Sequence, residues 1–89
     1  MNRKDKKNNE KLEKIKEIVI TSIANQANKE INEITLETNL TADLNFDSLD
    51  VVELLMDLED KFNIEIPESD LTKINIVNDI VEYLYKHTK

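Results

Sequence analysis

The helical spacing of the apolar residues between positions 48 and 62 constrains this chain of 89 residues more than any other feature. At about 100° per residue, one narrow side of that segment is wholly apolar. It consists of Val51, Leu54, Leu55, Leu58 and Phe62. A side of this kind is stable only when other elements cover it, so the segment predicts a helix over about 48–62 that belongs to a packed core.

The opposite side of the same segment combines apolar and acidic residues. Its members are Leu49, Val52, Met56, Glu53, Glu59 and Asp60. Single exposed apolar residues are ordinary on small domains, but three in one line on an acidic helix favour a docking surface. Such a surface binds through its apolar centre and attracts basic partners through its carboxylates.

Two further segments repeat apolar residues at helical spacing. The first, over about 10–26, follows Asn9 as a candidate N-cap. The second, over about 76–86, follows Asn75 in the same way. Together with residues 48–62, these segments predict three main helices.

The remaining stretches predict one short helix and one long connection. Pro67 suits the first turn of a helix near 68–73. The connection over 27–47 follows no single period, and a loop this long in a small domain needs anchors in the core. We expect these anchors to be Ile31, Ile34, Leu36, Leu40 and Leu44. The predicted fold is all-α, a small bundle of three main helices plus one short helix.

Charge is distributed unevenly along the chain. Residues 1–16 hold seven Lys and Arg against three Asp and Glu, whereas residues 17–89 hold five against sixteen. The acidic body disfavours nucleic acid and anionic lipid, even with a basic start, and favours partners with basic surfaces. The polar, non-periodic start predicts a disordered basic lead-in over 1–9, before one domain over 10–89.

No stretch of the chain has the apolar length of a membrane span. The first residues also lack the apolar segment of a signal peptide. We therefore expect a cytoplasmic protein with no membrane span, and a monomer.

Composition removes several classes of function. The chain has no Cys, which excludes disulfides, thiolate zinc sites and a cysteine nucleophile. It also has no Gly, which excludes glycine-rich phosphate loops and the Gly-x-Ser-x-Gly elbow of hydrolases. Its one histidine, His87, lies close to the end of the chain, so a catalytic triad is disfavoured. Composition therefore disfavours an enzyme.

Ser48 stands between two carboxylates at the start of the predicted 48–62 helix, and four roles are open to it. Ser48, or Asp47 before it, is a suitable N-cap. A calcium site is the second possibility, because Asp43, Asn45 and Asp47 match the first three ligand positions of an EF-hand loop. Ser48 and Leu54, however, stand where that loop needs Gly and Glu, so no metal site is predicted.

The other two roles involve chemistry at the Ser48 oxygen. Nucleophilic catalysis needs a neighbouring base, and the sequence places no His or Lys nearby. Covalent attachment of a phosphate-containing group needs no base on this chain. The added phosphate would lie at the positive end of a helix, beside unpaired backbone N–H groups. Asp47 and Asp50 would oppose its charge.

The segment Asp43–Pro67 resembles the acyl carrier proteins. It carries Asp-Ser-Leu at 47–49, the acidic and apolar stretch 50–62, and Ile-Glu-Ile-Pro at 64–67. The similarity extends from about Leu12 to Leu84 and is closest to the discrete carriers of type II fatty acid synthesis. The three-residue motif alone is weak, but the acidic helix, the Ile-Pro turn and the chain length strengthen it.

This resemblance implies a cofactor and a function. In the family, the serine of Asp-Ser-Leu, here Ser48, receives 4′-phosphopantetheine from coenzyme A through a phosphopantetheinyl transferase. The thiol of that covalent arm carries growing acyl chains as thioesters in fatty acid biosynthesis. The protein would then be a non-catalytic carrier, which accounts for a chain without Cys that handles thioesters.

The resemblance also implies which residues meet the partners. By position, the recognition residues are Asp47, Leu49, Asp50, Val52, Glu53, Met56, Glu59 and Asp60. Their partners would be the transferase, fatty acid synthase enzymes and acyltransferases with basic surfaces. The apolar interior would shelter the acyl chain, with Phe46, Leu54, Leu58, Ile66 and Ile74 among the lining residues.

Two departures and two alternatives accompany the resemblance. Many family members have Gly where Asn45 stands, and Asn tolerates the left-handed backbone that such a turn requires. The basic start is an addition to the family's pattern.

Within the fold, the cargo could instead be a polyketide, an aminoacyl group or D-alanine. Outside it, the alternative is an unmodified helical adaptor or metal sensor.

Overall fold

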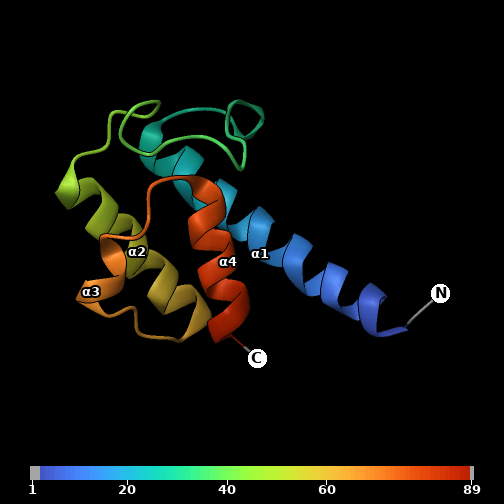
Figure 1. Ribbon diagram of the computed structural model, residues 1–89. Helices are drawn as coiled ribbons and strands as arrows, with labels where there is room; N and C mark the ends of the chain where they lie inside the picture. The colour runs from blue at the N-terminus through green and yellow to red at the C-terminus, as the bar shows by residue number, and fades with distance from the viewer. Residues whose placement is uncertain (1–2, 89) are drawn as a thin grey trace.

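The computed structural model describes residues 3–88 of the chain, with side chains from residue 10 onward. Within them the chain forms four α-helices, one 3-10 turn and no strand beyond an isolated bridge between Asn39 and Ile76 (Figure 1). The elements are α1 (Arg3–Ala27), η1 (Ile31–Glu33), α2 (Ser48–Phe62), α3 (Glu68–Leu71) and α4 (Val77–His87). The predicted all-α bundle of three main helices and one short helix is confirmed.

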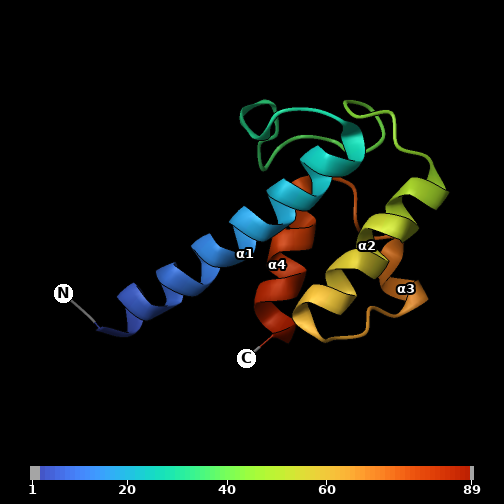
Figure 2. The same cartoon turned by 180° about the vertical axis from the view of Figure 1, so that it is seen from behind.

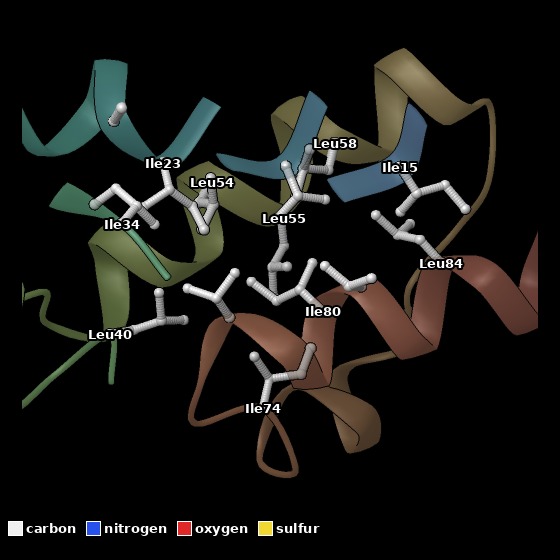
Figure 3. Close-up of a cluster of buried hydrophobic side chains, with 14 of the residues drawn as sticks. Ile15, Ile23, Ile34, Leu40, Leu54, Leu55, Leu58, Ile74, Ile80 and Leu84 are labelled. Atoms are coloured by element: carbon white, nitrogen blue, oxygen red, sulfur yellow. The ribbon is translucent and has the colours of Figure 1, made fainter. Parts of the chain in front are cut away.

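The core lies where α1, α2 and α4 meet, with the α1–α2 connection covering one end (Figure 3). Its side chains come from the predicted apolar sides of the three helices and from that connection. Those exposed by less than 2 % are Val19, Ile23, Leu40, Leu54, Leu55, Leu58, Val77, Ile80, Val81 and Leu84. Burial of these aliphatic groups supplies the main driving force for folding.

Helix α1 begins at Arg3, so the predicted start near residue 10 is wrong, as is Asn9 as its N-cap. Residues 3–9 contain neither Gly nor Pro and three of them are lysines, so nothing in the sequence stops the helix there. The first turns of α1 extend beyond the other helices (Figure 2). The division into a lead-in over 1–9 and a domain over 10–89 stays a prediction.

The connection between α1 and α2 is anchored mostly as predicted. Ile34 and Leu40 are buried, and Leu36 and Leu44 are partly buried against the core. Ile31 is 57 % exposed, so its prediction as an anchor is wrong. The turn η1, which begins at this residue, contributes no buried side chain.

Backbone hydrogen bonds fasten this connection to the start of α4. The N–H groups of Val77 and Asn78 donate to the carbonyls of Thr38 and Leu36, at 3.0 and 2.9 Å. The Leu40 N–H donates to the Asn75 carbonyl at 3.0 Å. The first two of these bonds use the first N–H groups of α4, which have no partner within the helix. They hold the segment that leads into α2 in a fixed place.

The predicted N-cap of α4, Asn75, is wrong. The N-cap residue is Ile76, and α4 begins at Val77. Asp79, inside the first turn, accepts hydrogen bonds on Oδ2 from the N–H groups of Asn75 and Ile76, at 2.9 and 3.0 Å. A carboxylate one turn into the helix therefore replaces the expected Asn side chain, and it also suits the helix dipole.

Within residues 3–88, three residues adopt a positive φ, and all three are Asn: Asn28, Asn45 and Asn63, at 56°, 61° and 55°. Asn63 is the C-cap of α2 and Asn45 precedes its N-cap. Asn is the residue other than Gly that best tolerates this conformation. The expectation that Asn45 can take the place of Gly in its turn is confirmed. Among the described residues, no helix has the length and apolar character to cross a membrane.

Candidate functional site

The start of α2 is closed by a reciprocal pair of carboxylates. Asp47 is the N-cap, and its Oδ1 accepts the Asp50 N–H at 2.8 Å. Asp50 returns the bond, since its Oδ2 accepts the Asp47 N–H at 3.0 Å. This capping box satisfies two N–H groups and places two negative charges at the positive end of the helix. The N-cap role that the sequence offered to Ser48 or Asp47 therefore belongs to Asp47.

Ser48 is the first residue of α2, and its side chain is exposed. Its Oγ forms no hydrogen bond with any residue that the structure describes. The hydroxyl thus stands free at the end of a 15-residue helix whose cap is supplied by another side chain. Ser48 is fixed in position by the helix and accessible to a modifying enzyme.

The turn that leads into α2 is held by Asn39 and Asp43. The Oδ1 of Asn39 accepts the N–H groups of Thr41 and Ala42, at 2.9 and 2.8 Å. Asp43 accepts the Asn39 N–H on Oδ2 at 2.7 Å. Two of the three carboxamide and carboxylate groups considered for calcium, those of Asp43 and Asp47, are therefore bonded to the backbone. Residues 10–88 contain no group of three His, Cys, Asp or Glu side chains arranged to hold a metal ion.

A hollow of about 360 Å³ lies beside Ser48. Val51 and Val52 of α2 form one wall, and Leu71 and Ile74 contribute apolar surface from the side of α3. Of the five residues that the resemblance offered as acyl-chain lining, Ile74 borders this hollow. Phe46, Leu54 and Leu58 are buried in the core and Ile66 is partly buried.

Five of the eight predicted recognition residues form one exposed or half-exposed side of α2. Leu49 and Met56 are 65 % and 58 % exposed, and Val52 lies between them, half-buried. Glu53 and Asp60 are exposed beside this apolar line. We call these five residues the α2 face; it has an apolar centre and free carboxylates.

The other three predicted recognition residues hold the local structure together. Asp47 and Asp50 form the capping box, and Glu59 accepts the Ile66 N–H on Oε2 at 2.6 Å. A carboxylate that is already bonded to the backbone contributes less to an incoming partner than a free one. Asp57, which the sequence reading left out, is exposed near the α2 face and pairs with Lys61 at 3.0 Å. Asp57 follows Glu53 by four residues, and residues at this spacing are neighbours on the surface of a helix. This spacing could have placed Asp57 near the α2 face from the sequence alone.

Two side-chain bonds join α2 to α1. Gln26 of α1 donates through Nε2 to the Asp50 carbonyl at 2.6 Å. Lys61 donates through Nζ to the Oγ of the buried Ser22 at 2.7 Å. One bond lies near each end of α2, so the α2 face is presented on a helix fixed at both ends.

A family model described as "Phosphopantetheine attachment site" matches residues 17–84 of this chain. The match spans the later part of α1, all of α2 and α3, and most of α4, and it defines the class as carriers of a covalent 4′-phosphopantetheine. The geometry fits that group, because a free hydroxyl stands at a helix N-terminus beside a hollow with a mixed lining, in which Val51, Val52, Leu71 and Ile74 are the apolar residues.

Curated relatives narrow the class. The acyl carrier protein of Clostridium acetobutylicum is 43 % identical over 77 residues, which are 86 % of this chain and 95 % of that protein. That of Helicobacter hepaticus is 46 % identical over 72 residues, 81 % of this chain and 90 % of that protein. That of Rickettsia bellii strain RML369-C is 38 % identical over 77 residues, 86 % and 90 % of the two chains. The chain belongs to the acyl carrier protein family.

Proposed function

We propose that this protein carries growing acyl chains as thioesters on a 4′-phosphopantetheine arm attached to Ser48, in fatty acid biosynthesis. The observation that carries the proposal is the free, exposed Ser48 hydroxyl at the first position of α2. Asp47 takes the capping role that would otherwise occupy a serine there. The chain itself then needs no catalytic base, since a phosphopantetheinyl transferase supplies the attachment chemistry.

The α2 face supplies the recognition in this proposal. Partner enzymes with basic surfaces would contact Leu49, Val52 and Met56 and be attracted by Glu53 and Asp60. Apolar contacts set how long a complex lasts, whereas carboxylates near the rim mainly set how fast it forms. Acyltransferases and fatty acid synthase enzymes are the expected partners, together with the transferase.

The experiment that tests the attachment is an intact-mass measurement. The purified chain is incubated with coenzyme A, magnesium and a broad-specificity phosphopantetheinyl transferase, and the product is then digested and sequenced by mass spectrometry. We expect a gain of one phosphopantetheine, located on the peptide that contains Ser48. No gain from the folded, unmodified chain, or a gain on another residue, would contradict the proposal.

Neutralising the two free acids of the α2 face is expected to slow binding of partners. Glu53→Gln with Asp60→Asn removes two charges that no described residue pairs with, so the association rate with the transferase should fall by roughly tenfold at low salt. Stopped-flow or surface-binding measurements over a salt series would give that rate. The difference from the unsubstituted chain should shrink as salt rises, because salt screens exposed charges.

A matched control removes the same net charge elsewhere. Glu17→Gln with Glu82→Gln changes two exposed acids on α1 and α4, away from the α2 face. If this control slows association as much as the α2 pair, the effect comes from net charge and the α2 face is not the recognition surface.

A further inference from the structure

The short helix α3 is held in place by its neighbours more than by its own residues. It has four residues, no side-chain N-cap bond and no buried side chain. Isolated helical turns of this length are unstable in water. Its position must therefore be set by the contacts that it and its flanking residues make with α2 and α4.

Leu71 of α3 and the flanking Ile66 are packed against the core, and the flanking Ile74 is buried in it. Two side-chain bonds add directional contacts to this packing. Before α3, Glu59 of α2 accepts the Ile66 N–H at 2.6 Å. Within α3, Asp70 accepts on Oδ2 the hydroxyl hydrogen of Tyr83, on α4, at 3.0 Å. Lys73 lies 3.8 Å from the other Asp70 oxygen, but its side chain is 78 % exposed, so that pair contributes little.

Tyr83 is suited to remain a donor. The pKa of its phenol is raised above the usual 10.0 by burial, then by its hydrogen bond to Asp70 and by the charges of Asp70 and Glu59. The hydroxyl is therefore protonated throughout the neutral range. The Tyr83 ring is also stacked on His87 with centroids 4.2 Å apart, which fixes its orientation.

The residues that these bonds hold form one side of the hollow next to Ser48. Glu68, Leu71 and Thr72 face Val51 and Val52 of α2 across it. Displacement of α3 away from α2 would widen the hollow and open its apolar walls. The position of α3 therefore sets how much apolar surface a group attached at Ser48 can reach.

We propose that Asp70 and Tyr83 are a positioning pair that fastens α3 over the hollow beside Ser48 and so controls access to it. Glu59 forms the fixed end of this fastening, because its bond is to the backbone. The hydroxyl–carboxylate bond is the releasable end, because it joins two side chains near the surface. The effect on an attached group rests on the proposed function of Ser48, whereas the fastening of α3 does not.

The first test is hydrogen–deuterium exchange on the unmodified chain. Tyr83→Phe removes the hydroxyl and keeps the ring, and Asp70→Ala removes the acceptor. We expect the amides of residues 66–74 to exchange about tenfold faster in both variants, while those of residues 54–58 in α2 keep their rates. The matched control is Tyr85→Phe, which removes a hydroxyl two residues along the same helix.

Two results would overturn the fastening of α3. One is exchange over residues 66–74 at the unsubstituted rate in Tyr83→Phe. The other is equal acceleration in α2 and α3, which would mean that the bond stabilises the whole fold and does not position α3.

The second test measures access to the hollow. A coenzyme A analogue whose pantetheine ends in a polarity-sensitive dye is transferred to Ser48. We expect the dye emission of Tyr83→Phe and Asp70→Ala to move to shorter wavelength than that of Tyr85→Phe, because the opened hollow offers apolar walls. If the three variants gave the same emission wavelength although α3 exchanged faster in Tyr83→Phe and Asp70→Ala, the proposal that α3 controls access to the hollow would be overturned. Failure of every chain to accept the dye would instead contradict the proposed function and leave the exchange result to decide the fastening.

Discussion

Ser48→Ala is expected to abolish attachment of phosphopantetheine completely while the fold remains as it is. The substitution removes the Oγ that would form the phosphodiester bond, and no described residue depends on that oxygen for a hydrogen bond. Helix α2 keeps its cap because Asp47 and Asp50 supply it. The free energy of unfolding should change by no more than about 0.5 kcal/mol, as for other exposed positions.

The measurement is intact mass after incubation with coenzyme A and transferase, together with a denaturant titration of the same sample. Ser69→Ala is the matched control, because Ser69 is also exposed and lies in a helix, α3. A Ser48→Ala chain that still gains phosphopantetheine would show that attachment occurs elsewhere. A control chain that fails to gain it would show that α3 must be intact for the transferase to act.

Leu58→Ala is expected to have the largest effect on stability. Leu58 is fully buried where α2 contributes to the shared core. Truncation of a buried leucine to alanine costs about 2–5 kcal/mol, from lost burial and from the cavity left behind. The total stability of a domain this small is on the order of 4–13 kcal/mol, so the substitution should remove a large share of it and lower the midpoint of unfolding clearly.

Urea titration followed by circular dichroism gives the change in the free energy of unfolding. Met56→Ala is the control on the same helix, because its side chain is 58 % exposed and its loss should cost no more than about 0.5 kcal/mol. If Leu58→Ala and Met56→Ala lowered the free energy of unfolding equally, the assignment of the buried and exposed sides of α2 would be contradicted. Met56→Ala should instead weaken partner binding, since Met56 belongs to the α2 face.

The sequence by itself determined the three main helices, the sides they bury and the position of Ser48. A helix repeats every 3.6 residues, so the spacing of Leu54, Leu55 and Leu58 identifies a buried side without knowledge of what covers it. The bounds of α2 follow from local chemistry, with a capping carboxylate at one end and a left-handed Asn at the other. The family resemblance rests on this same segment.

Only the tertiary structure decided which acidic side chains are free. Helical angles place Glu59 near the edge of the α2 face, but its carboxylate is bonded to the Ile66 N–H. The angle fixes where a side chain leaves the helix, and long side chains then turn toward whichever donors the fold brings near. The same holds for Asp70 and Tyr83, which are 13 residues apart and meet because α3 lies against α4.

The sequence also did not determine where α1 begins or that Ile31 is exposed. A polar segment without Gly or Pro is compatible with both a disordered start and a continued helix, and composition does not choose between them. An isoleucine in a loop is buried only if the chain path brings it over the core, and the path of residues 28–33 does not do so for Ile31. Local spacing thus determines the helices and their inner sides, whereas long-range packing decides the loop path and the partners of each polar group.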